Sequence, residues 1–74
     1  MGRQQQEHVP IPVAGIEAAT PKAVLAKYFD ADIGKFRTIW IPRSQLHDGE
    51  DIVVDPDVKE LYITPWFCNK EGLL

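Results

Sequence analysis

Cysteine is nearly absent from this sequence, which contains Cys68 and no other thiol. One cysteine cannot form an intramolecular disulfide, so the chain is not a disulfide-stabilised secreted mini-protein. A structural zinc site is not expected either, because such sites use about four ligands that usually include several thiolates. His8, His47 and Cys68 lie far apart in the sequence and lack ligand spacing. We therefore expect no metal ion and no other cofactor.

The sequence also lacks any long apolar run. No segment approaches the ~18 apolar residues that a membrane-spanning helix needs. The first residues, MGRQQQEHVPIPVAG, contain no continuous apolar segment of the kind found in secretory signals. We therefore expect a cytoplasmic protein with no membrane partner.

Recognisable catalytic motifs are missing as well. There is no glycine-rich phosphate-binding loop, no paired histidines and no nucleophile beside an obvious base. Ser44 and His47 are three residues apart, but a catalytic triad also needs an orienting group and an oxyanion site. A chain of 74 residues also has little room for a deep pocket. The sequence therefore predicts a protein that is not an enzyme.

The residues that are present divide the chain into two unequal parts. Residues 1–20 hold a glutamine run followed by Pro10 and Pro12, which favour extended backbone and oppose a helix. We interpret residues 1–20 as a flexible or weakly docked tail. An alternative is an edge strand or a segment docked in a groove, since apolar residues alternate at positions 9, 11 and 13. Residues 21–74 are expected to form a single small globular domain.

Four segments of the expected domain have the composition of β-strands. They are rich in β-branched and aromatic residues, are separated by turn residues, and span 22–29, 36–41, 51–54 and 60–64. The first segment also contains good helix formers. Its connection to the second is a short turn-like segment, DADIGK, which predicts an antiparallel hairpin and favours the strand.

A short helix is predicted at the end of the chain. Thr64 precedes Pro65, the usual order of an N-cap and a first helical residue, and Gly72 suits the left-handed residue that ends a helix. So short a helix must dock through Trp66 or Phe67. The expected fold is thus mainly β, of the α+β type. It is a small antiparallel four-stranded sheet, or a partial barrel of the SH3 or OB kind, with a short C-terminal helix.

Trp40 lies in the second predicted strand, where neither face is purely polar. The residues that share its face are Phe36 and Thr38, and they alternate with Arg37, Ile39 and Ile41. Pro42 is expected to end the strand. We expect Trp40 to be a core or barrel-rim residue beside a candidate interface.

Charge is unevenly distributed along the chain, although its sum is only −3. Residues 22–43 carry five basic and two acidic side chains, whereas residues 48–60 carry six acidic side chains and one basic one. Acidic residues are common in turns for local reasons, but together they would attract a basic partner. The predicted protein-binding residues are Asp48, Glu50, Asp51, Asp55, Asp57 and Glu60.

Binding of single-stranded nucleic acid is the alternative function. Aromatic side chains stack on bases at about 1–3 kcal/mol each, while basic residues contact the phosphates. The negative net charge and the pI of about 5.2 oppose this function, because counterion release supplies most non-specific affinity. The residues that would bind nucleic acid are Lys27, Tyr28, Lys35, Phe36, Arg37, Trp40 and Arg43.

Part of the chain resembles a group of small, uncharacterised bacteriophage proteins. The resemblance rests on KAVL at 22–25, WIPRSQL at 40–46 and PWFCNKEGL at 65–73. It implies a phage or prophage origin and a bacterial cytoplasm, and it supplies no activity or site residues. The function we expect is a non-catalytic interaction module, a phage accessory protein that binds a host or phage protein. Inhibition of a host defence or DNA-processing complex is one form of this function, and an exposed strand edge would also permit homo-oligomers.

Overall fold

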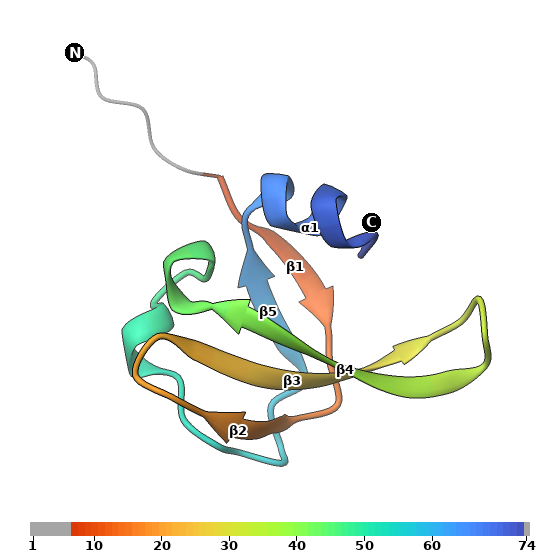
Figure 1. Ribbon diagram of the computed structural model, residues 1–74, viewed down its shortest axis with the longest axis horizontal. Coiled ribbons are helices and arrows are strands. Elements are labelled where there is room, and N and C mark those ends of the chain that lie inside the picture. The colour runs from red at the N-terminus through yellow and green to blue at the C-terminus, as the bar shows by residue number, and fades with distance from the viewer. Residues whose placement is uncertain (1–6, 74) are drawn as a thin grey trace.

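The structure, a computed structural model, describes residues 7–73. This part of the chain contains five strands, two 3₁₀ helices and one α-helix (Figure 1). The elements are β1 Val9–Pro12, β2 Ile16–Ala19, β3 Ala23–Asp30, β4 Lys35–Pro42, η1 Arg43–Gln45, η2 Gly49–Asp51, β5 Glu60–Ile63 and α1 Pro65–Glu71. The expected mainly β fold with a short C-terminal helix is confirmed.

The strands form two antiparallel sheets rather than one. β1 pairs with β5, whereas β2, β3 and β4 lie side by side in a three-stranded sheet. The expected four-stranded sheet is therefore only partly matched, and the two sheets do not close into a barrel. β3 and β4 pair without interruption from Ala23 opposite Pro42 to Asp30 opposite Lys35. This pairing agrees with the hairpin that the sequence predicts.

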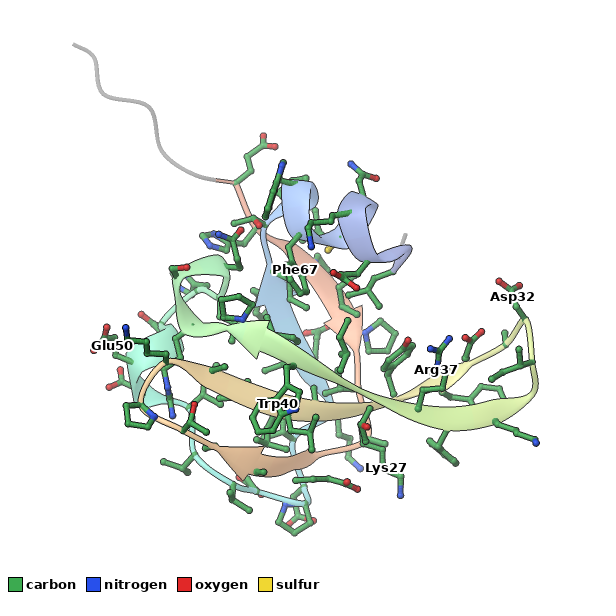
Figure 2. All side chains as sticks on the ribbon, viewed as in Figure 1. Lys27, Asp32, Arg37, Trp40, Glu50 and Phe67 are labelled. Carbon is green, nitrogen blue, oxygen red and sulfur yellow. The ribbon has the colours of Figure 1, made fainter. Side chains whose placement is uncertain are left out.

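The turn of the β3–β4 hairpin is organised by Asp30. Its side-chain Oδ1 accepts a hydrogen bond from the Asp32 N–H at 2.9 Å, and its carbonyl accepts one from the Gly34 N–H at 2.8 Å. Gly34 has a φ of 69°, a conformation that glycine adopts without steric cost. Asp32 therefore lies at the far tip of a hairpin that projects beyond the rest of the molecule (Figure 2).

The core lies between the two sheets and α1. Val24 and Ala26 of β3 and Ile41 of β4 are fully or almost fully buried, so one face of the three-stranded sheet points inward. Each large apolar side chain removed from water contributes about 1.5–3 kcal/mol. The buried hydrophobic residues are Ile11, Ile16, Val24, Ala26, Ile41, Leu46, Leu61, Ile63, Phe67 and Cys68.

Part of the segment that we interpreted as a tail belongs to the folded domain. Residues 9–19 provide β1 and β2, in which Ile11 is 5% and Ile16 is 1% exposed. The alternative of a strand over alternating apolar residues agrees with β1, where Ile11 lies opposite Leu61. These strands are short and contain prolines and alanines, so pairing with β5 and β3 decides their conformation. Residues 1–6 lie outside the described residues.

The strand predicted over 51–54 is wrong. Asp51 ends η2, and residues 52–54 have no strand assignment. Their β-branched composition favours a strand, but a strand also needs a hydrogen-bonded neighbour. The carbonyl of Ile52 instead accepts a hydrogen bond from the Arg43 side chain at 2.8 Å. Val53 and Val54 consequently remain 64% and 56% exposed.

The terminal helix forms as its flanking residues predict. The Thr64 hydroxyl accepts a hydrogen bond from the Phe67 N–H at 3.4 Å, and Gly72 ends the helix at a φ of 72°. The helix docks through Phe67, which is 4% exposed and points toward the strands (Figure 2). Trp66, the other expected anchor, is 62% exposed, because consecutive helical residues point in different directions.

Candidate protein-binding groove

The loop between β4 and β5 is held in place by the side chain of Arg43. Its Nε donates to the carbonyl of Thr20 at 2.9 Å, and its Nη1 donates to the carbonyls of Gly49 and Ile52 at 2.6 and 2.8 Å. Hydrogen bonds from an ionised donor are shorter and stronger than neutral ones. The guanidinium of Arg43, which we predicted to contact phosphates, is therefore engaged with this loop instead.

Two tight turns follow one another where η1 contacts η2. A Cβ atom on Gly49 would overlap the carbonyl oxygen of Arg43, so glycine is required at this position. Asp48 has a φ of 54°, a left-handed conformation that aspartate tolerates better than most residues. Its exposed carboxylate lies 3.3 Å from Nε2 of His47. Asp48 and Gly49 thus belong to a turn that starts the acidic part of the surface.

A groove of about 410 Å³ opens between this loop and β5. Ile52 and Val58 of the loop and Leu61 of β5 line it, and all three side chains also pack in or against the core. Val53 and Tyr62 also line the groove and are 64% and 46% exposed. An apolar depression with a few polar groups around it is the usual form of a binding site.

Acidic side chains surround this apolar surface. Four of the six predicted protein-binding residues line the groove, and they come from three separate parts of the chain: Asp48, Asp51, Asp55 and Glu60. The other two, Glu50 and Asp57, are exposed but are not part of its lining. The fold thus separates the acidic run into a groove set and an outer set.

Two carboxylates of the groove are held by hydrogen bonds. Asp55 Oδ1 accepts a hydrogen bond from the Asp57 N–H at 2.9 Å, and the Asp55 backbone bridges to Ile16. Glu60 Oε1 accepts a hydrogen bond from the Tyr62 hydroxyl at 2.9 Å. This hydrogen bond, together with the negative charge of Glu60, raises the pKa of Tyr62 above its ordinary value of 10.0. Tyr62 therefore remains a neutral donor to Glu60 near neutral pH.

Three residues predicted to bind nucleic acid share the outer face of the β3–β4 hairpin. Nζ of Lys27 lies 4.9 Å from the ring centroid of Phe36, and the Phe36 ring meets that of Phe29 at 5.3 Å. Trp40 is on this face and is 49% exposed (Figure 2). We expected a core or barrel-rim residue, and the placement in the core is wrong. The reason is alternation: β4 turns Ile41 into the core, which directs its neighbour outward.

The remaining hairpin residues of that prediction lie on the opposite face. Tyr28, Lys35 and Arg37 lie on the same face of the hairpin as the buried Val24, but beyond the end of the core. Nη1 of Arg37 forms an ion pair with Asp30 Oδ2 at 3.3 Å. The structure therefore divides the predicted nucleic-acid residues between two faces and a loop.

His8 and His47 are closer than their sequence separation implies. Their ring centroids are 5.4 Å apart in an edge-on arrangement. Within residues 7–73, however, no group of three His, Cys, Asp or Glu side chains is arranged to hold a metal ion. Cys68 is buried in the core, and burial raises the pKa of its thiol.

Sequence reasoning did not find the apolar part of the groove. Ile52 falls in the segment predicted as a strand, and Val58 lies within the acidic segment 48–60 without any predicted role. One usable signal was the alternation in β5, which buries Leu61 and Ile63 and leaves Tyr62 exposed. The carbonyl of Ile52 accepts a hydrogen bond from the Arg43 side chain, and no local pattern predicts this contact.

Comparison of the chain with models of known protein families, with curated proteins and with solved structures gives no match. Among the described residues, no helix has the length and apolar composition that crossing a membrane requires. The geometry of the groove and of the hairpin is therefore the basis for assigning a function.

Proposed function

We propose that this protein is a non-catalytic binding module whose acidic groove binds a basic, partly apolar segment of another protein. The observation that carries this proposal is the arrangement of four carboxylates around one apolar surface. Neither the apolar surface nor the carboxylates would indicate a binding site alone, because exposed apolar residues and acidic turns are both common on protein surfaces. Their combination in one groove defines the chemistry of the partner.

Such a partner would use both parts of the groove. Lysine and arginine side chains lay their aliphatic stems along apolar surface and keep their charged ends near carboxylates. Opposite charge on the two partners speeds association and selects the orientation of binding. Asp51 and Glu60 lie on different elements, so a bound segment would contact both the loop and β5.

The resemblance to small bacteriophage proteins extends this proposal to the kind of partner. A phage accessory protein would bind a host or phage protein in the bacterial cytoplasm. Nucleic-acid-binding surfaces are basic, so they match an acidic groove. Inhibition of a host defence or DNA-processing complex through such a surface is the specific form of the function that we propose.

The experiment compares two double variants with the same change in charge. Asp51→Lys with Glu60→Lys reverses two groove carboxylates, whereas Glu50→Lys with Asp57→Lys reverses the two outside its lining. The probe is a peptide in which lysine and arginine alternate with leucine and valine. We expect the groove variant to bind the peptide at least about tenfold more weakly than the outer variant, as measured by calorimetry.

Methyl NMR spectra of the unmodified protein locate the binding site. Signals of Ile52, Val58 and Leu61 should shift when the peptide is added, and those of Val24 should not. If both double variants weaken binding equally, only net charge is recognised and the groove is not the site. Unshifted methyl signals in the presence of bound peptide would contradict the proposal in the same way.

A second candidate function is binding of single-stranded nucleic acid by the outer face of the hairpin. The observation that favours it is the exposed row of Phe29, Phe36 and Trp40, with the ammonium group of Lys27 over one ring. Aromatic rings of this kind serve as stacking surfaces for bases. Of the cations among the seven predicted residues, Lys27 alone lies on this face. Nucleic-acid binding is therefore the weaker of the two candidate functions.

A further inference from the structure

β4 is an edge strand whose outer edge has no hydrogen-bonded neighbour among the described residues. β3 pairs with it along its whole length on one side. Within residues 7–73, no other backbone hydrogen bond between elements involves residues 35–42. β5 belongs to the other sheet and passes across β4 without pairing with it (Figure 1). An unpaired strand edge is a template for pairing with another strand.

The other edge of the same sheet is protected in ways that β4 is not. β2 is four residues long, is interrupted by a bulge between Ile16 and Ala18, and is bridged through Ile16 to Asp55. Short length, bulges and covering segments are the usual devices that prevent edge pairing. β4 instead runs for eight residues in unbroken register with β3, and its proline, Pro42, stands only at its end.

The ladder with β3 determines which backbone groups of β4 face outward. The N–H of Arg43 donates to the carbonyl of Lys22 at 2.9 Å, immediately beyond the last paired residues. Hydrogen-bonded and non-hydrogen-bonded pairs alternate in an antiparallel ladder, so the odd-numbered residues of β4 bond to β3. The N–H and C=O groups of Phe36, Thr38 and Trp40 therefore face the free edge.

We propose that β4 pairs antiparallel with β4 of a second copy of this protein, across a two-fold axis at Thr38. In this register Thr38 lies opposite Thr38 of the second copy, and Phe36 lies opposite Trp40 of the second copy. Every outward N–H and C=O from Phe36 to Trp40 then gains a partner. The contact is self-complementary, as a two-fold interface must be, and its directly opposed aromatic pairs stabilise the sheet.

The charges of β4 are compatible with this pairing. Arg37 lies opposite Ile39 of the second copy, and Lys35 lies opposite Ile41 of the second copy. No two like charges are directly opposed, and such opposition is destabilising in antiparallel pairs. Arg37 is also partly neutralised by its ion pair with Asp30. An exposed aromatic face therefore continues from one copy to the other.

Each other two-fold register opposes β4 to a turn, a proline or a like charge. A two-fold axis at Phe36 would place the turn at 30–34 opposite part of the strand, where the chain is no longer extended. An axis at Trp40 would place Pro42 opposite Thr38, and proline has no N–H to donate. An axis at Arg37 would oppose two like charges, and an axis at Ile39 would place Pro42 opposite Phe36. The centre at Thr38 keeps the paired segment within β4 of both copies without opposing a proline or two like charges.

The unmodified protein provides the first test. In sedimentation over a concentration series from low micromolar to several hundred micromolar, the mass should rise from the 8.4 kDa of one chain toward that of two. Hydrogen exchange of the Phe36, Thr38 and Trp40 amides should slow as concentration rises. The amides of Arg37 and Ile39, which bond to β3, should be protected at every concentration.

Variants at Thr38 provide the second test. Thr38→Pro removes an outward N–H without removing a bond to β3, and we expect at least about tenfold weaker association. Thr38→Val keeps the N–H and the branched shape, so it should associate as the unmodified protein does. The proposal is overturned if the protein stays monomeric over the whole concentration series. This holds even if β4 then binds a strand of a different protein. So does association that leaves the exchange of the Thr38 amide unchanged.

Discussion

At the scale of single residues, Arg43 shows how one side chain can organise a surface. It follows the last residue of β4, and its guanidinium bonds to carbonyls of Thr20, Gly49 and Ile52. These carbonyls belong to segments without strand partners, so the side chain supplies hydrogen bonds that a sheet would otherwise provide. The position of the acidic groove therefore depends on a basic residue that does not itself line it.

Replacement of this side chain tests that dependence. We expect Arg43→Met to lower the free energy of unfolding by about 2–3 kcal/mol, because the part-buried carbonyls of Gly49 and Ile52 lose a charged donor. Arg43→Lys should lower the free energy of unfolding by about half as much, since an ammonium group cannot reproduce the planar fork of donors. Urea denaturation followed by circular dichroism measures both changes. A loss below about 0.5 kcal/mol for Arg43→Met would show that the loop is held by other contacts.

At the scale of elements, β4 presents two chemically different faces. Ile41 is 1% exposed and lies opposite Val24 in the core, whereas Trp40 is 49% exposed and lies opposite Leu25 on the outer face. Both residues are large, apolar and consecutive, so composition does not distinguish them. The register with β3 does, because each residue takes the face of the residue opposite to it.

Adjacent alanine substitutions in β4 should therefore differ sharply. Ile41→Ala is expected to cost about 2–5 kcal/mol of stability, since it leaves a cavity in the core. Trp40→Ala is expected to cost below about 1 kcal/mol, which is the size of a cross-strand contact on an open face. Chemical denaturation of the two variants gives the comparison. Equal losses would mean that Trp40 contributes to the core despite its exposure.

At the scale of the whole molecule, opposite charges occupy different regions. The acidic groove lies between the β4–β5 loop and β5, and the basic residues of the hairpin lie along β3 and β4. In Figure 2, Glu50 lies at one end of the molecule, and Lys27 and Arg37 of the hairpin lie toward the other. A protein with a net charge of −3 can still bind an anion locally, but long-range attraction of nucleic acid is not expected.

The nucleic-acid candidate is tested by a salt titration. Trp66→Phe leaves Trp40 as the fluorescent reporter, and single-stranded DNA and RNA are added at about 50 mM and about 200 mM salt. If the outer face binds, Trp40 emission should be quenched, and log affinity should fall against log salt by about 0.7 for each phosphate contacted. Because Lys27 is the one predicted cation on this face, a shallow dependence is expected. No quenching at the lower salt concentration would remove this candidate.

Local patterns were sufficient for much of the fold. The β3–β4 hairpin, β5 and the helix from Pro65 all form where composition, turn residues and capping residues predict. The incorrect secondary-structure predictions for 9–19 and 51–54 have one cause, because each rested on the propensities of the segment's own residues. The first became two strands because neighbours pair with it, and the second lost its strand because it has no such neighbour.

The candidate site likewise has some features that the sequence predicts and others that it does not. The sequence by itself determined that the segment from Asp48 to Glu60 is acidic and rich in turns, because these are properties of residue types in order. Only the tertiary structure decided that four of its carboxylates surround an apolar groove while Glu50 and Asp57 do not. It also decided that Trp40 faces outward, because register and long-range hydrogen bonds, rather than local composition, determine which side chains meet.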